Sequence, residues 1–174
     1  SLNIASCNIR FENPKDGVND WPNRKPLLLE ALRDFSPDIL GTQEGREPQI
    51  RNLHEGIAHL SLADDHRQWL ESRMYPTIFF NPERLHCLQS GDIWLSETPQ
   101  VPGSVSFQSM FPRLCTWTIL EMKQTDVQFL VINVHLDHVR PKTRLAQITV
   151  LIDEVEKINS QNLPVILLGD FNED

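Results

Sequence analysis

The stretch Leu163–Asp174, "LPVILLGDFNED", joins an apolar run to an aspartate and an asparagine two positions apart. The apolar residues, bounded by a proline and a glycine, predict a short buried strand. Asp170 and Asn172 follow at its carboxyl end. If the backbone stays extended, both polar side chains lie on one side and Phe171 points the other way, into packing. The stretch therefore predicts a strand that carries polar side chains to a site.

Three other apolar runs also end in polar residues. "NIASCN" ends at Asn8, "DILGTQE" ends at Glu44, and "FLVINVH" carries Asn133 and His135. In open α/β sheets, sites form where the carboxyl ends of strands meet. Taken singly, each residue has a structural explanation as a turn residue, a salt-bridged strand end or a hydrogen-bonded histidine. Their occurrence together at four strand ends favours a functional site.

The residue types at these strand ends indicate a particular metal chemistry. One glutamate, one aspartate, several asparagines and one histidine supply hard oxygen donors and no thiolate. Such a set suits Mg²⁺ or Mn²⁺, which bind one or two carboxylates, waters and phosphate oxygens. Zinc is the weaker candidate, because "HEGIAH" places His54 and His59 about 140° apart on a helix.

Composition limits the class of protein. The 174 residues, 40% hydrophobic and 23% charged, predict one soluble globular domain, and no apolar run approaches the roughly 20 residues that span a bilayer. The net charge of −8 disfavours a surface that binds long nucleic acids. A small phosphorylated substrate, or a nucleic acid reached through a metal, stays open, and the oligomeric state is not indicated.

The cysteines and the start of the chain give information on the cellular compartment of the protein. Cys7, Cys87 and Cys115 are odd in number, widely spaced and set among apolar neighbours, so we interpret them as buried thiols. Buried free thiols favour a reducing compartment, and hence the cytoplasm. The start has no signal-peptide pattern, but it also lacks an initiator methionine, so a removed targeting segment stays open.

Periodicity predicts alternating strands and helices. Helical spacing indicates helices around 27–35, 49–62 and 141–158. Strands are expected at 2–9, 37–44, 114–122, 127–135 and 164–169, with two or three more between 77 and 96. The strands at 114–122 and 127–135 predict an antiparallel hairpin. Because strand and helix alternate at both ends, with antiparallel strands between, an α/β or α+β layered fold with a mixed sheet is expected.

At these motifs the sequence resembles the endonuclease/exonuclease/phosphatase superfamily of DNase I-like, metal-dependent phosphoesterases. "NIR", "QE", "NVHLDH" and "GDFN" stand in the family's order over essentially the whole chain. "GDIWLSETPQVPGS", and "HLDH" followed by "RLAQ", are similar to a bacterial-type branch. The resemblance implies a single domain over 1–174 that forms the N-terminal portion of an αββα sandwich with mixed sheets.

The resemblance also implies roles for individual residues. Glu44 would bind the divalent metal with Asn8 beside it, and His135 would contact the scissile phosphate. Asp170 would orient or deprotonate the attacking water, and a second metal at Asp170 stays open. Asn172 would hold a phosphate oxygen. Weaker expectations are a phosphate contact by Arg46 or Asn133 and assistance from Asp137 and His138. Trp94 and Ser96 could line the substrate side, although Trp94 is better explained as core.

The resulting hypothesis is a Mg²⁺- or Mn²⁺-dependent hydrolase of phosphodiesters or phosphomonoesters, with the phosphorylated substrate unidentified. The family's second half ends in an "SDH"-like motif that these 174 residues lack. The chain is therefore expected to be C-terminally incomplete. The alternative hypothesis is a non-catalytic phospho-ligand binding module or an inactive truncated domain.

Overall fold

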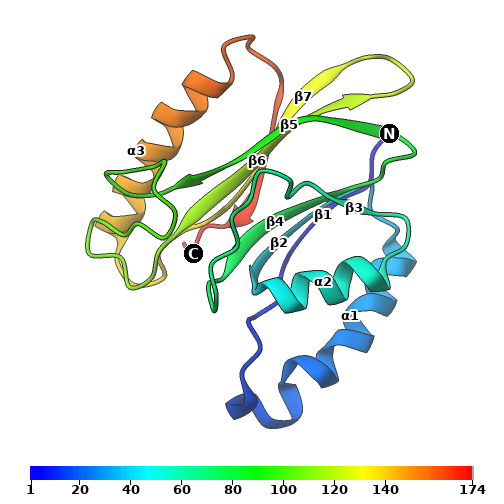
Figure 1. Cartoon of the computed structure of the whole chain (residues 1–174), viewed down its shortest axis with the longest axis horizontal. Helices are drawn as coiled ribbons and strands as arrows, with labels where there is room; N and C mark the ends of the chain where they lie inside the picture. The colour runs from blue at the N-terminus through cyan, green and yellow to red at the C-terminus, as the bar shows by residue number, and fades with distance from the viewer. Residues whose placement is uncertain (174) are drawn as a thin grey trace.

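The computed structural model describes residues 1–173 and forms four layers. Two four-stranded sheets lie face to face. Helices α1 (Trp21–Phe35) and α2 (Glu47–Gly56) cover the outer face of one sheet, and α3 (Pro141–Ile158) covers the outer face of the other (Figure 1). This arrangement is the αββα sandwich that the family resemblance implies.

Both sheets are mixed, as predicted. The first has the order β1 (Ile4–Asn8), β2 (Ile39–Gly45), β4 (Tyr75–Phe80), β3 (Ser61–Leu62), in which only β1 and β2 run parallel. The second has the order β5 (Leu85–Trp94), β6 (Leu114–Met122), β7 (Gln128–His135), β8 (Val165–Asp170), in which only β7 and β8 run parallel. The predicted hairpin is β6 and β7. A short 3₁₀ helix, η1 (Pro14–Asn19), precedes α1.

Apolar side chains fill each space between layers. The β-branched and aromatic residues of the strands alternate between the two faces of each sheet, so each strand contributes to two layers of core. Between the sheets lie Ile39, Ile78, Phe80, Leu120, Phe129 and Val131. Under α1 and α2 lie Leu29, Leu32, Leu40, Ile50, Leu53 and Phe79, and under α3 lie Cys115, Trp117, Leu130, Ile132, Val134 and Leu151.

The second helix is shorter than its apolar spacing predicts. α2 ends at Gly56, not near Leu62, although Ile57 and Leu60 are buried. A Cβ atom at Gly56 would lie 2.6 Å from Leu29 Cδ2, so any larger residue would have to displace the Leu29 side chain where the two helices approach. The chain leaves the helix at this glycine, and the two apolar residues reach the core from a turn.

The expectation of three buried thiols holds for one cysteine. Cys115 is fully buried, but Cys7 and Cys87 are half-buried, and all three are free. Cys7 lies on β1, at the edge of its sheet, so one side of its strand has no neighbouring strand among the described residues. In residues 1–173, no helix combines the length and apolarity needed to cross a membrane.

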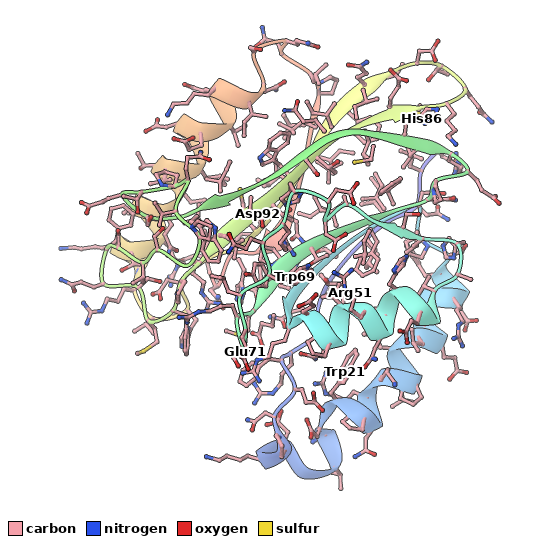
Figure 2. All side chains as sticks on the ribbon, viewed as in Figure 1. Trp21, Arg51, Trp69, Glu71, His86 and Asp92 are labelled. Carbon is pink, nitrogen blue, oxygen red and sulfur yellow. The ribbon has the colours of Figure 1, made fainter. Side chains whose placement is uncertain are left out.

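A buried arginine fastens the segment between β3 and β4 to the second sheet. The guanidinium of Arg67 lies near the rings of Trp69 and Tyr75, 4.7 Å and 4.5 Å from their centroids. It donates to both carboxylate oxygens of Asp92 on β5 at 2.9 Å. Arg51 of α2 also lies near the Trp69 ring, at 5.5 Å (Figure 2). One charged network thus joins α2, this segment and β5.

β8 lies at an edge of its sheet and is covered on one face only. Its inward residues Ile166 and Leu168 pack between the sheets. Its outward residues Val165 and Leu167 are 47% and 50% exposed. Among the described residues, β8 pairs with β7 alone. The strand that carries "GDFN" therefore has a half-exposed apolar face.

Candidate active site

The ends of four strands from both sheets meet at one place. The amide nitrogen Nδ2 of Asn8 donates to Glu44 Oε1 at 3.0 Å and to Asp170 Oδ2 at 2.8 Å. His135 Nε2 lies 3.7 Å from Asp170 Oδ2. The ligand atoms of Glu44, His135 and Asp170 all lie within 4.8 Å of one another. The structure thus brings together the side chains at the four strand ends.

A β-bulge aims Glu44 at this cluster. The register between β2 and β4 shifts between Thr42 and Gly45, and Glu44 has a φ of +66°. Positive φ is rare for a residue with a side chain, and a bulge turns a side chain away from the regular alternation. The Glu44 carboxylate accepts from the Phe11 N–H at 3.3 Å, which holds it in the turned position.

The "GDFN" turn folds back onto the end of β7. A Cβ atom at Gly169 would lie 2.4 Å from the carbonyl oxygen of Val134, so β8 approaches β7 at this point only because a glycine is present. Asn172 donates its N–H to Asp170 Oδ1 at 3.1 Å and its Nδ2 to the Leu136 carbonyl at 2.8 Å. These contacts fix the direction of the Asp170 carboxylate.

Asp170 is ionised at neutral pH. Burial opposes its ionisation, but hydrogen bonds from Asn8 and from the Asn172 N–H, together with the charge of Arg113, lower the pKa of Asp170. Its carboxylate is therefore available as a hydrogen-bond acceptor and as a metal ligand.

His135 is a buried neutral ring. It is 3% exposed, and its Nδ1 accepts from Arg113 Nη1 at 3.0 Å. Burial, with the neighbouring Arg113 charge, lowers the pKa of His135 to about 3. Sequence reasoning missed this contact of Arg113 with the site, because Arg113 precedes β6 in "FPRLC" and no spacing links it to His135.

Two predicted phosphate contacts lie outside this cluster. Asn133 is fully buried and joins the two sheets, donating to the carbonyls of Thr42 and Thr77 at 2.9 Å and accepting from Gln43 at 2.8 Å. Arg46 donates to the Glu12 carbonyl at 3.3 Å and lines a separate cavity of 440 Å³. The structure therefore gives Asn133 a structural role beneath the site and places Arg46 beside a different cavity.

Of the two predicted residues just after β7, Asp137 has a structural role and His138 lies at the site. Asp137 is fully buried and accepts from the N–H groups of Met110, Val139 and Arg140 at 2.9–3.1 Å, so it holds two loops together. His138 lines the cavity described next. Trp94 belongs to the core with Tyr75 and Leu114, as expected for this residue, and Ser96 is also fully buried.

A cavity of about 760 Å³ is lined in part by two members of the cluster, Asn8 and Asp170. Most of the side chains around it are polar, and both sheets contribute to its walls. Its lining includes Ser6, Asn8, Gln43, His138, Arg144, Asp170 and Asn172. Its size is that of a site for a small molecule.

The cluster fits a hard divalent cation. Glu44 and Asp170 aim two oxygen ligands at one point, where the Asn8 amide nitrogen now donates to both. Two carboxylates and open positions for water are the arrangement that Mg²⁺ or Mn²⁺ takes. The oxygen of Asn8 accepts from the Arg10 N–H at 2.8 Å, so in this orientation Asn8 offers the cluster its N–H groups and not its oxygen.

Two mixed sheets packed face to face between helices, with an acidic cluster at the converging strand ends, define a DNase I-like sandwich. The sequence model of the Endonuclease/Exonuclease/phosphatase family matches residues 1–174, and the chain belongs to this family.

Solved structures and curated sequences show similar proteins. A mannosyl-6-phosphatase of Bacteroides thetaiotaomicron is 32% identical with a TM-score of 0.92, over 100% of this chain and 66% of its own. A protein of unknown function from Enterococcus faecalis is 30% identical with a TM-score of 0.90, over 98% of this chain and 67% of its own. The Ccr4 exoribonuclease subunit of Mycosarcoma maydis is 23% identical, over 99% of this chain and 34% of its own.

Proposed function

We propose that the protein hydrolyses phosphoesters with the help of Mg²⁺ or Mn²⁺. One observation carries the proposal. Glu44 and Asp170, from different sheets, converge on the amide nitrogen of Asn8, and Asn8 and Asp170 also line a cavity with mostly polar walls. Like charges are held together at a structural cost unless a cation or a donor offsets them. Membership of a family of nucleases and phosphatases supports the same chemistry.

The side chains of the site would have different roles in the hydrolysis. A bound divalent cation would offset the charge of the phosphate oxygens and lower the pKa of a bound water. Glu44 and Asp170 would hold the cation, with Asn8 beside them. The ionised Asp170 would also orient the attacking water and accept its proton. Neutral His135 and the Asn172 amide would donate hydrogen bonds to phosphate oxygens, where negative charge develops.

A small phosphorylated molecule is the proposed substrate class, with a sugar phosphomonoester as its first candidate. The net charge of −8 disfavours contact with a long polyanion, and the cavity has the volume of a small-molecule site. The similar Bacteroides protein is described as a mannosyl-6-phosphatase, which supports a sugar phosphate.

The proposal is tested by phosphate release from sugar phosphates, with a nucleotide diester and a single-stranded oligonucleotide as competing substrates. We expect release from a sugar phosphate that needs added Mg²⁺ or Mn²⁺ and falls by at least about 100-fold in Glu44→Gln. Glu55→Gln, a change of an exposed glutamate on α2, is the matched control. Binding of inorganic phosphate without turnover of any substrate would instead support the binding-module alternative.

A further inference from the structure

Arg113 is a buried cation placed directly behind the candidate site. It is 5% exposed and lies just before β6. Its Nη1 donates to Nδ1 of His135 at 3.0 Å, and its Nη2 donates to Nδ1 of His138 at 3.3 Å. The ring of Phe111 lies 5.6 Å from its Cζ atom. One guanidinium thus contacts His135 at the end of β7 and His138 just after it.

The chemistry of a guanidinium determines where the histidine protons lie. A guanidinium carries only donors and stays charged, so each Nδ1 that it contacts must be an acceptor. A neutral imidazole with an acceptor at Nδ1 carries its hydrogen on Nε2. For His135, this N–H lies at the carboxylate cluster, because Nε2 is 3.7 Å from Asp170 Oδ2.

We propose that Arg113 is a positioning residue that fixes His135 as the Nε2–H tautomer, making it a hydrogen-bond donor to the substrate phosphate and excluding it from the metal ligands. The inference rests on the proposed function in one respect, because that function makes a phosphate of the substrate the acceptor of the His135 hydrogen bond. A ring nitrogen that carries hydrogen has no lone pair for a metal. Of the three groups that lie within 4.8 Å, only Glu44 and Asp170 therefore bind the cation.

The surroundings of Arg113 support this role. The charges of Glu44, Asp137 and Asp170 act on its guanidinium, although none of these three carboxylates lies close enough to form an ion pair with it. Its buried Nε has no acceptor among the described residues. A buried charge with an unpaired N–H is costly for stability, and such costs are typical of functional sites. The two partners that Arg113 contacts through its terminal nitrogens are the two histidines.

The test begins with the tautomer itself, which is independent of activity. Long-range ¹H–¹⁵N spectra of the full-length protein should show His135 with hydrogen on Nε2 and a bare Nδ1, the signal being assigned by its loss in His135→Gln. In Arg113→Met we expect the single tautomer to be lost. Arg113→Lys should restore it in part, because lysine keeps a charged donor. Hydrogen on Nδ1 of His135 in the unchanged protein would overturn the inference.

Metal binding and kinetics supply the second part of the test. Titration with Mn²⁺ alone should show an affinity that falls at least about 10-fold in Glu44→Gln and changes little in His135→Gln. Arg113→Met should lower kcat by about 10- to 100-fold, the range for a residue that orients a catalytic group. Arg73→Met, a change of an exposed arginine, should leave kcat unchanged.

These readouts separate the two proposals. The expected tautomer in a protein that hydrolyses no phosphoester would uphold the assignment of Arg113 and His135 and refute the proposed function. Hydrolysis in a protein whose Mn²⁺ affinity collapses in His135→Gln would uphold the function and overturn the assignment. If Arg113→Met does not fold, the spectrum of the unchanged protein and Arg113→Lys still decide the tautomer.

Discussion

At the scale of single residues, Asn8 links the two sides of the site, because its amide lies between two carboxylates that would otherwise repel each other. Its Nδ2 lies 3.0 Å from Glu44 Oε1 and 2.8 Å from Asp170 Oδ2. A divalent cation would satisfy the same two oxygens more strongly. The amide and the cation are thus alternative means of holding one pair of charges.

This equivalence predicts the behaviour of Asn8→Ala. Without metal, we expect the free energy of unfolding to fall by about 1–2 kcal/mol, because two charge-assisted hydrogen bonds are lost. Added Mg²⁺ or Mn²⁺ should recover most of the loss, so the rise in Tm on adding metal should be larger in the variant than in the unchanged protein. Urea unfolding with and without metal measures both values. An equal rise in Tm on adding metal in the two proteins would contradict the idea that the Asn8 amide and the cation hold the same two carboxylates.

Gly169 tests the close approach that sets the "GDFN" turn. Gly169→Ala places a Cβ atom 2.4 Å from the Val134 carbonyl oxygen, so we expect a loss of stability of about 2–3 kcal/mol. Gly17→Ala is the matched control, because Gly17 also has a positive φ, +59°, but no atom within 4 Å of the added Cβ. Gly17→Ala should lower the free energy of unfolding by about 1 kcal/mol. Equal losses in chemical unfolding would show that backbone conformation, not the contact, requires Gly169.

The residues of the site were predictable to different degrees. Asn8, Glu44, His135 and Asp170 each follow an apolar run, and strand alternation with the meeting of strand ends predicts their convergence. Arg113 was not predictable, because its partner is 22 residues away and a lone arginine in a loop carries no local pattern. The buried position of Asn133, and the bulge that aims Glu44, likewise depend on contacts between sheets.

At the scale of elements, the charged network around Arg67 makes stability depend on pH. Burial opposes ionisation of Asp92, but the charge of Arg67 and hydrogen bonds from His66 and Arg67 outweigh it and lower the pKa of Asp92 to about 2. A depressed folded-state pKa gives stability that is present above the unfolded pKa and lost as pH falls through the folded one. The loss therefore falls between pH values of about 4 and 2.

This network predicts an acid-sensitive part of the stability. Between those pH values, we expect the free energy of unfolding to fall by about 2 kcal/mol on account of Asp92. The double variant Arg67→Met/Asp92→Asn removes the charge and its partner together, so no buried charge is left unpaired. It should show a correspondingly smaller acid dependence in urea unfolding at several pH values. The same slope in both proteins would assign the acid dependence to other carboxylates.

The elements themselves were largely predictable, but their partners were not. Periodicity located all three long helices and the strands from Leu114 onward. It extended α2 beyond Gly56, because Ile57 and Leu60 continue the apolar spacing from a turn. β4 and β5 follow each other closely in sequence yet belong to different sheets. Local pattern predicts a strand, whereas the choice of sheet depends on the packing of the whole sandwich.

At the scale of the whole molecule, one face of the second sheet carries exposed apolar groups. Val165 and Leu167 of β8 are 47% and 50% exposed, and Leu145 of α3 is 69% exposed. A cavity of 330 Å³ next to them is lined by Leu145, Ile148 and Phe171, among others. Among the described residues, β8 also leaves one edge without a partner strand. Exposed apolar patches and free strand edges both promote association.

We therefore expect the polypeptide 1–174 to self-associate through β8. Sedimentation should show species larger than the 20.1 kDa monomer, in a proportion that rises with concentration. Leu167→Lys should shift the population toward monomer, because a lysine on an edge strand opposes pairing with a second strand and makes the outer face polar. Val18→Lys is the control, because Val18 is 83% exposed on η1, far from β8 in the chain. Monomers at all concentrations, or an equal effect of both lysines, would show that β8 does not drive association.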